Sequence, residues 1–105
     1  MVSHEIKIDT IKLLQKKELE IAEAKGHDYA DSEDALSNLK ACERFDIPAV
    51  HGVMVRLSDK WCRLEQFVKK GEFKVNDEKL IDTIIDMRNY LAFLLMLYNE
   101  GERNE

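Results

Sequence analysis

The chain has 105 residues, of which 45% are hydrophobic and 35% are charged, and its net charge is -5. This length allows one domain, residues 1–105, and the composition is typical of a folded soluble protein rather than a disordered one. The negative charge argues against a protein that grips the nucleic-acid backbone, which needs a basic surface. The longest apolar stretch, residues 91–98, is too short to span a bilayer. The two cysteines, Cys42 and Cys62, are too few for a disulfide framework, and reduced thiols indicate the cytoplasm. We therefore expect a single cytoplasmic domain that binds neither nucleic acid nor membrane.

The first predicted elements are two helices. Glycine and proline are scarce, with 4 and 1 residues, which favours a few long helices over many short strands. Ser3 is a good N-cap for a helix over residues 3–25, and Gly26 is expected to end it. A second helix is expected to start at Ser32 and to continue to Phe45, before Pro48 interrupts the chain.

Two more helices are predicted in the second half of the chain. Over residues 50–68 the apolar positions fall within one narrow arc of a helix: Val53, Leu57, Trp61, Leu64 and Val68. Lys69, Lys70 and Gly71 are expected to end this helix. The last helix should begin at Asn76 or Asp77 and run to Asn99, followed by a frayed tail over residues 100–105. The fold class we predict is all-α, a four-helix-type bundle.

The last predicted helix is apolar around most of its circumference near its end. The residues concerned are Leu91, Phe93, Leu94, Leu95, Met96, Leu97 and Tyr98. A helix that is apolar on all sides must be covered on more than one side. We therefore expect the bundle to be completed by homo-oligomerisation, as a dimer or tetramer.

Acidic residues form a stripe on the same helix. The spacing of Glu78, Asp82, Asp86 and Asn89 places all four on one face. Three acids in a row repel one another unless a cation lies among them, and Mg²⁺ prefers carboxylate oxygens together with the phosphates of a substrate. The stripe is also compatible with the solvated face of an amphipathic helix, because Lys79, Thr83 and Arg88 occupy the adjacent arc.

Basic residues gather on the preceding predicted helix. Arg56, Asp59 and Arg63 share a face beside the apolar stripe, with Lys60 at its edge. Guanidinium groups match phosphate oxygens with paired hydrogen bonds, so this face can hold a phosphate chain. The alternative is a set of exposed ion pairs of little energetic weight.

A third group lies at the first predicted break, where Lys25 is followed by Asp28 and Tyr29. An aromatic ring in a loop can stack on a base, and a carboxylate can accept hydrogen bonds from a base or a ribose. Tyr29 is equally suited to filling the core. Other common chemistries have no support, because the chain has no Gly-rich phosphate loop and its three histidines lack metal-ligand spacing.

These groups follow one another in an order that resembles a known family. The pattern is Lys25…Asp28-Tyr29, Asn38, Arg56-x-x-Asp59-Lys60-x-x-Arg63-Leu64, and Glu78-x-x-x-Asp82-x-x-x-Asp86-x-x-Asn89-Tyr90. It is similar to the nucleotide-modification-associated family of small phage and bacterial proteins, which is grouped with the MazG-like all-α nucleotide pyrophosphohydrolases. The resemblance covers roughly residues 19–98.

The resemblance implies an oligomeric helical bundle that uses Mg²⁺ to hydrolyse a nucleoside triphosphate to a monophosphate and pyrophosphate. It implies that Asp59, Glu78, Asp82 and Asp86 are metal ligands, with Glu78 and Asp82 also catalytic. The nucleotide contacts would come from Lys25, Asp28, Tyr29, Asn38, Arg56, Lys60, Arg63, Asn89 and Tyr90. Because Asp59 stands alone and the last acids are spaced by four, a nucleotide-binding or nucleotide-sequestering helical protein without catalysis is the alternative.

Overall fold

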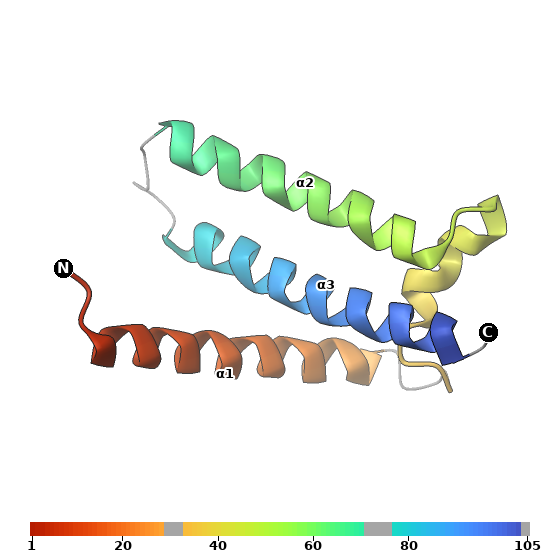
Figure 1. Ribbon diagram of the computed structural model, residues 1–105, viewed down its shortest axis with the longest axis horizontal. Coiled ribbons are helices and arrows are strands. Elements are labelled where there is room, and N and C mark those ends of the chain that lie inside the picture. The colour runs from red at the N-terminus through yellow and green to blue at the C-terminus, as the bar shows by residue number, and fades with distance from the viewer. Residues whose placement is uncertain (29–32, 71–76, 104–105) are drawn as a thin grey trace.

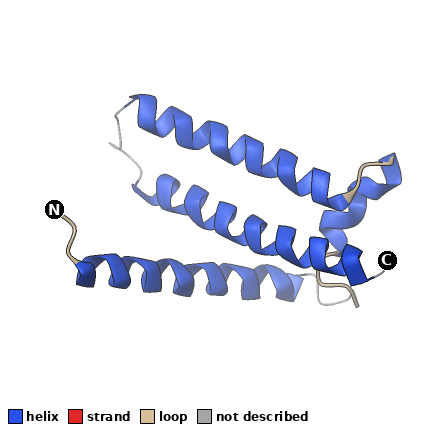
Figure 2. Ribbon diagram, viewed as in Figure 1, coloured by secondary structure: helices blue, strands red, loops and turns tan. Residues whose placement is uncertain are grey.

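The computed structural model of the chain describes residues 1–28, 33–70 and 77–103, without the side chains of residues 26–28, 77–79 and 102–103. Within these ranges the chain forms helices and no β-strand (Figures 1 and 2). The elements are α1 (His4–Asp28), the 3₁₀ helix η1 (Ser37–Phe45), α2 (Ala49–Lys70) and α3 (Asp77–Arg103). The predicted all-α fold is confirmed for the described part. No helix there is both long enough and apolar enough to cross a membrane.

Helix α1 begins as predicted and ends later than predicted. The Ser3 Oγ accepts a hydrogen bond from the Ile6 N–H at 3.1 Å, so Ser3 caps the first turn. The helix then passes through Gly26 and reaches Asp28. A glycine weakens a helix by only about 1 kcal/mol, and it ends one only where the chain leaves in a left-handed conformation.

The second helix is shorter than predicted and of another type. Ser32 lies outside the described residues, and the helix begins at Ser37 as a 3₁₀ helix. The Asp34 Oδ1 accepts the Leu36 N–H at 2.9 Å, so the segment before Ser37 is a turn that the aspartate stabilises. The helix ends at Phe45 as predicted, and Asp46 follows in the left-handed conformation with φ 60°.

Helices α2 and α3 match their predicted positions, except at the end of α3. Pro48 directly precedes α2, and its carbonyl accepts the Gly52 N–H at 3.1 Å. The predicted end of α3 at Asn99 is wrong, because this helix continues to Arg103. One reason is that the Lys40 Nζ donates a hydrogen bond to the Glu100 Oε1 at 2.6 Å, which fastens the end of α3 to η1.

The three long helices lie side by side with α3 in the middle (Figure 1). Helix α2 runs antiparallel to α3, α1 runs parallel to α3, and η1 lies at the end where α2 begins and α3 ends. Within the described ranges α1 packs against α3 but not against α2. The molecule measures 47 × 27 × 27 Å.

The hydrophobic core lies between η1, α2 and α3. Its buried residues are Leu39, Ala49, Val53, Leu57 and Leu97. Large apolar side chains remain exposed on both long helices of this core. On α2, Trp61 is 56% exposed and Val68 is 73% exposed, although the sequence predicts both in the apolar stripe. On α3, Leu91 and Leu95 are 54% and 61% exposed. This core therefore covers one side of each helix and leaves a second apolar side open.

Candidate functional site

A cavity of about 570 Å³ lies where the C-terminal part of α1, η1 and the facing sides of α2 and α3 meet, and we call it the Arg56 cavity. Its volume is in the range of small-molecule binding sites. Its wall contains six of the residues predicted to contact a nucleotide or a metal: Lys25, Asn38, Arg56, Asp86, Asn89 and Tyr90. The remaining wall is apolar, formed by Ala22, Ala35, Leu36, Leu39, Phe93 and Met96.

The charged part of the cavity centres on Asp86. The Lys60 Nζ donates a hydrogen bond to the Asp86 Oδ2 at 2.9 Å, and the Lys25 Nζ lies 4.0 Å from the Asp86 Oδ1. Lys60 is well shielded, with 17% of its side chain exposed. The carboxylate therefore joins a lysine from α1 and a lysine from α2, and it holds both ammonium groups near the cavity.

Arg56 adds a third cation. It is exposed and forms no ion pair with any side chain that the structure describes. Lys25 and Arg56 in the wall, together with Lys60 bound to Asp86, thus give three cations against one carboxylate. The excess of positive charge, together with an open guanidinium, suits an anionic ligand.

The aromatic part of the cavity comes from α3. Tyr90 and Phe93 both line it, and their rings make an edge-to-face contact with centroids 6.3 Å apart. Asn38, half-buried on η1, adds an amide to the same wall. The cavity therefore combines cations with aromatic surface, as recognition of a phosphorylated ligand with a flat ring requires.

Asn89 has a structural role in addition to its place in the wall. It is buried, and its Nδ2 donates a hydrogen bond to the Glu18 carbonyl of α1 at 3.4 Å. The neighbouring Arg88 Nε donates to the Glu18 Oε2 at 3.0 Å. These two contacts hold α1 against α3 and so position Lys25.

Several predicted site residues are not brought into the cavity. Asp59 and Arg63 are exposed on α2 outside its wall, and Arg63 lines a separate small depression with Gln66, Phe67 and Lys70. Asp82 is exposed one helical turn before Asp86. Tyr29 and the side chains of Asp28 and Glu78 lie outside the described residues.

The predicted metal ligands are Asp59, Asp82 and Asp86, whose side chains the structure describes, and Glu78, whose side chain it does not. Among the described side chains, no three histidine, cysteine, aspartate or glutamate side chains are close enough together to hold a metal ion. Both oxygens of Asp86 face lysines instead.

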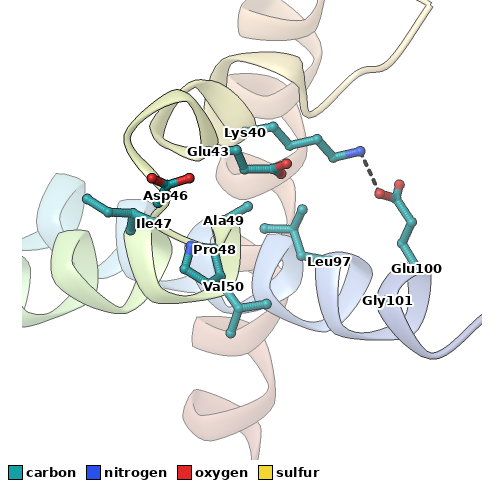
Figure 3. A pocket seen from close by; sticks show the side chains of 10 residues that line it. All are labelled: Lys40, Glu43, Asp46, Ile47, Pro48, Ala49, Val50, Leu97, Glu100 and Gly101. Atoms are coloured by element: carbon teal, nitrogen blue, oxygen red, sulfur yellow. Dashed lines mark hydrogen bonds and ion pairs between the residues drawn. The ribbon is translucent and has the colours of Figure 1, made fainter. Parts of the chain in front are cut away.

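A second cavity, of about 420 Å³, lies at the other side of η1 (Figure 3). Lys40 points across it to Glu100, and it also donates a hydrogen bond to Asp34. The wall contains three acids, Glu43, Asp46 and Glu100, against this one lysine. Because Lys40 is already paired with carboxylates, this cavity is poorly suited to a phosphate.

Sequence reasoning missed the aromatic contribution of Phe93, which it assigned to an all-round apolar helix. The signal was present, because Phe93 lies four residues after Asn89 and three after Tyr90, and Asp86 lies three residues before Asn89, so all four share a helix face. The hydrogen bond between Lys40 and Glu100 has no such sequence signal, because it joins residues 60 positions apart.

Comparison of the chain with protein-family models, curated proteins and solved structures finds no significant match.

Proposed function

We propose that this protein binds a nucleoside phosphate in the Arg56 cavity. The proposal rests on one juxtaposition: Lys25 and Arg56 line the same cavity as the Tyr90–Phe93 wall, and Lys60 is bound to the Asp86 carboxylate of that cavity. In the proposed complex the phosphates lie at Arg56, Lys25 and Lys60, and the base lies against the aromatic wall near Asn38. The proposal places the protein in the cytoplasm, where nucleotides are available.

The charge balance supports binding of a di- or triphosphate. Asp86 neutralises one of the three cations, which leaves about two positive charges for the ligand. A phosphate that approaches Arg56 can also draw on the two lysines without displacing them from Asp86, because an ammonium group has three donors. Each hydrogen bond to a charged group contributes on the order of 1.5–3 kcal/mol.

The experiment is calorimetric titration of the protein with a panel of nucleoside mono-, di- and triphosphates, first without added metal. The variant Arg56→Gln should weaken binding by roughly 10- to 100-fold, which corresponds to the loss of one or two charged hydrogen bonds. The matched control is Lys69→Gln, which removes an exposed cation of α2 that lies outside the cavity. Equal losses in the two variants, or no binding of any nucleotide, would contradict the proposal. A helical interaction protein without a small ligand would then be the better hypothesis.

The second candidate function is Mg²⁺-dependent hydrolysis of a nucleoside triphosphate to a monophosphate and pyrophosphate. Its support is the ordered resemblance described above and the position of exposed Asp82 one turn from Asp86 on α3. Mg²⁺ would have to compete with Lys60 for Asp86. Incubation with triphosphates and Mg²⁺, followed by detection of both products, tests the activity. The variant Asp82→Asn should abolish it without lowering thermal stability, because a like-charge repulsion is removed.

Asp86→Asn separates the two candidates. If the protein only binds nucleotides, removing the carboxylate leaves all three cations free, and metal-independent affinity should rise severalfold. If Asp86 is a metal ligand of a hydrolase, the same change should abolish Mg²⁺-dependent product formation. The two results are measured separately, by calorimetry without metal and by product analysis with metal.

A further inference from the structure

Exposed apolar residues on α2 recur at a regular interval. Met54, Trp61 and Val68 are seven residues apart, and they are 51%, 56% and 73% exposed. On α3, Leu91 and Leu95 are 54% and 61% exposed. We call these five residues the Trp61 face. Soluble monomers rarely expose a contiguous apolar patch larger than a few hundred Å².

The five residues lie on one side of the α2–α3 pair. At about 100° per residue, Met54, Trp61 and Val68 flank one edge of the buried stripe of α2, whereas Arg56 flanks the other edge. On α3, Leu91 and Leu95 lie away from Asp86 and Phe93 by the same count. Arg56, Asp86 and Phe93 line the Arg56 cavity. The Trp61 face is therefore the side of the α2–α3 pair opposite the cavity.

The spacing identifies the kind of partner that this face accepts. On α2, Leu57 and Leu64 follow Met54 and Trp61 by three residues, which gives the a and d positions of a heptad repeat. On α3, Ile84, Leu91 and Tyr98 form the a row, and Met87 and Leu94 form the d row. Leu57 is buried and Leu64, Met87 and Leu94 are partly buried, whereas most of the a row is exposed. The antiparallel α2–α3 pair thus has the pattern of one half of a four-helix bundle.

We infer that a second copy of this chain covers the Trp61 face, so that two α2–α3 pairs form a four-helix bundle related by a two-fold axis. Half-exposed side chains of this size each present on the order of 100 Å², so the face offers roughly 500 Å² of apolar surface. A stable dimer buries about 800 Å² on each partner, of which some 60% is apolar. The face matches that apolar requirement. Pairing of identical surfaces is the commonest form of assembly.

This arrangement assigns separate sides to assembly and to binding. The two-fold contact is opposite the Arg56 cavity, so each cavity is complete within one chain. The inference does not depend on the proposed nucleotide ligand, and its test can succeed or fail independently of it.

The test is light scattering over a range of concentrations, combined with fluorescence of Trp61, the sole tryptophan of the chain. The wild-type protein should show twice the 12.3 kDa mass of one chain at micromolar concentration. On dilution its tryptophan emission should shift to the red as Trp61 becomes exposed. The variant Trp61→Lys should have the mass of one chain, retain its helical circular dichroism and retain its affinity for any nucleotide that the wild-type protein binds.

The matched control is Leu13→Lys, which changes an apolar residue of α1 that is 49% exposed and lies outside the Trp61 face. This variant should keep the dimer mass. A wild-type mass of 12.3 kDa throughout, or dissociation by both variants alike, would overturn the inference. If Trp61→Lys loses its helical signal, the variant Leu91→Lys replaces it and should have the mass of one chain. The dilution series of the wild-type protein then tests the dimer without any substitution.

Discussion

Lys40 joins two segments that are far apart in the sequence, and it does so through charge. It binds Asp34, in the turn before η1, and Glu100, in the last turns of α3. The hydrogen bond from Lys40 lowers the pKa of Asp34 below its ordinary value of 3.8, and the Leu36 N–H lowers it further. The hydrogen bonds to Asp34 and to Glu100 raise the pKa of Lys40 above its ordinary value of 10.5.

These shifts predict a pH window for stability. A lowered aspartate pKa contributes stability above 3.8, and that contribution disappears as the pH falls through the lowered value. A raised lysine pKa contributes stability below 10.5, and that contribution disappears as the pH rises through the raised value. The wild-type protein should therefore melt at a higher temperature than Lys40→Gln by a constant margin between roughly pH 5 and 9, with the margin shrinking below about pH 3.5. A margin that does not change in acid would show that Lys40 acts by packing rather than by charge.

The contact between η1 and α2 depends on a glycine. A Cβ built on Gly52 would lie 2.8 Å from the Cys42 Sγ, closer than real Cβ contacts, so Gly52 permits η1 to approach α2. The Cys42 Sγ donates a hydrogen bond to the Leu39 carbonyl at 3.6 Å. This close approach brings η1, and with it Asn38, into the wall of the Arg56 cavity.

We expect Gly52→Ala to lower the free energy of unfolding by about 1 kcal/mol, because crowding outweighs the helix propensity of alanine. In a Cys42→Ala background the sulfur is absent, so the same substitution should be neutral or stabilising by up to about 1 kcal/mol. Urea denaturation of the four proteins in this cycle measures the coupling. Stabilisation by Gly52→Ala in both backgrounds would show that η1 can move aside without loss.

At the scale of the whole molecule, α1 is attached less extensively than the other long helices. In the described part it packs against α3 alone, through Glu18 contacts to Arg88 and Asn89 and through Lys25 to Asp86. Helices with few buried apolar contacts open at lower free energy than the core. Hydrogen exchange should therefore be faster along α1 than in the middle of α2 and α3. A bound nucleotide that contacts Lys25 should slow exchange in the C-terminal half of α1, whereas exchange before Glu18 should change little. Uniform protection of all three helices without ligand would contradict this ranking.

The sequence by itself determined the fold class and the positions of the long helices. The regular apolar spacing of Val53, Leu57 and Leu64, the Ser3 cap and the scarcity of glycine and proline are local properties, and local properties specify helices. The sequence misplaced the helix ends that depend on competing side-chain hydrogen bonds or on residues far away in the sequence. Asp34 makes a turn where a helix start was predicted, and Lys40 binds Glu100 of α3, beyond the predicted end of that helix.

The candidate site was determined partly by the sequence alone and partly by the tertiary structure. Spacing alone placed Asp86 and Asn89 on one face of α3, and the family resemblance added Tyr90. The tertiary structure decided that Arg56 and Lys60 of α2 meet that face while Asp59 and Arg63 of the same helix do not. The packing of Val53 and Leu57 turns Asp59 away from α3, and Arg63 lies about two turns further along α2 than Arg56, beyond the cavity. It also decided that Asp86 pairs with two lysines, since the ammonium groups of α1 and α2 reach it only after the three helices have packed. A helical repeat specifies which residues share a face, but only packing against a neighbouring helix decides what that face meets.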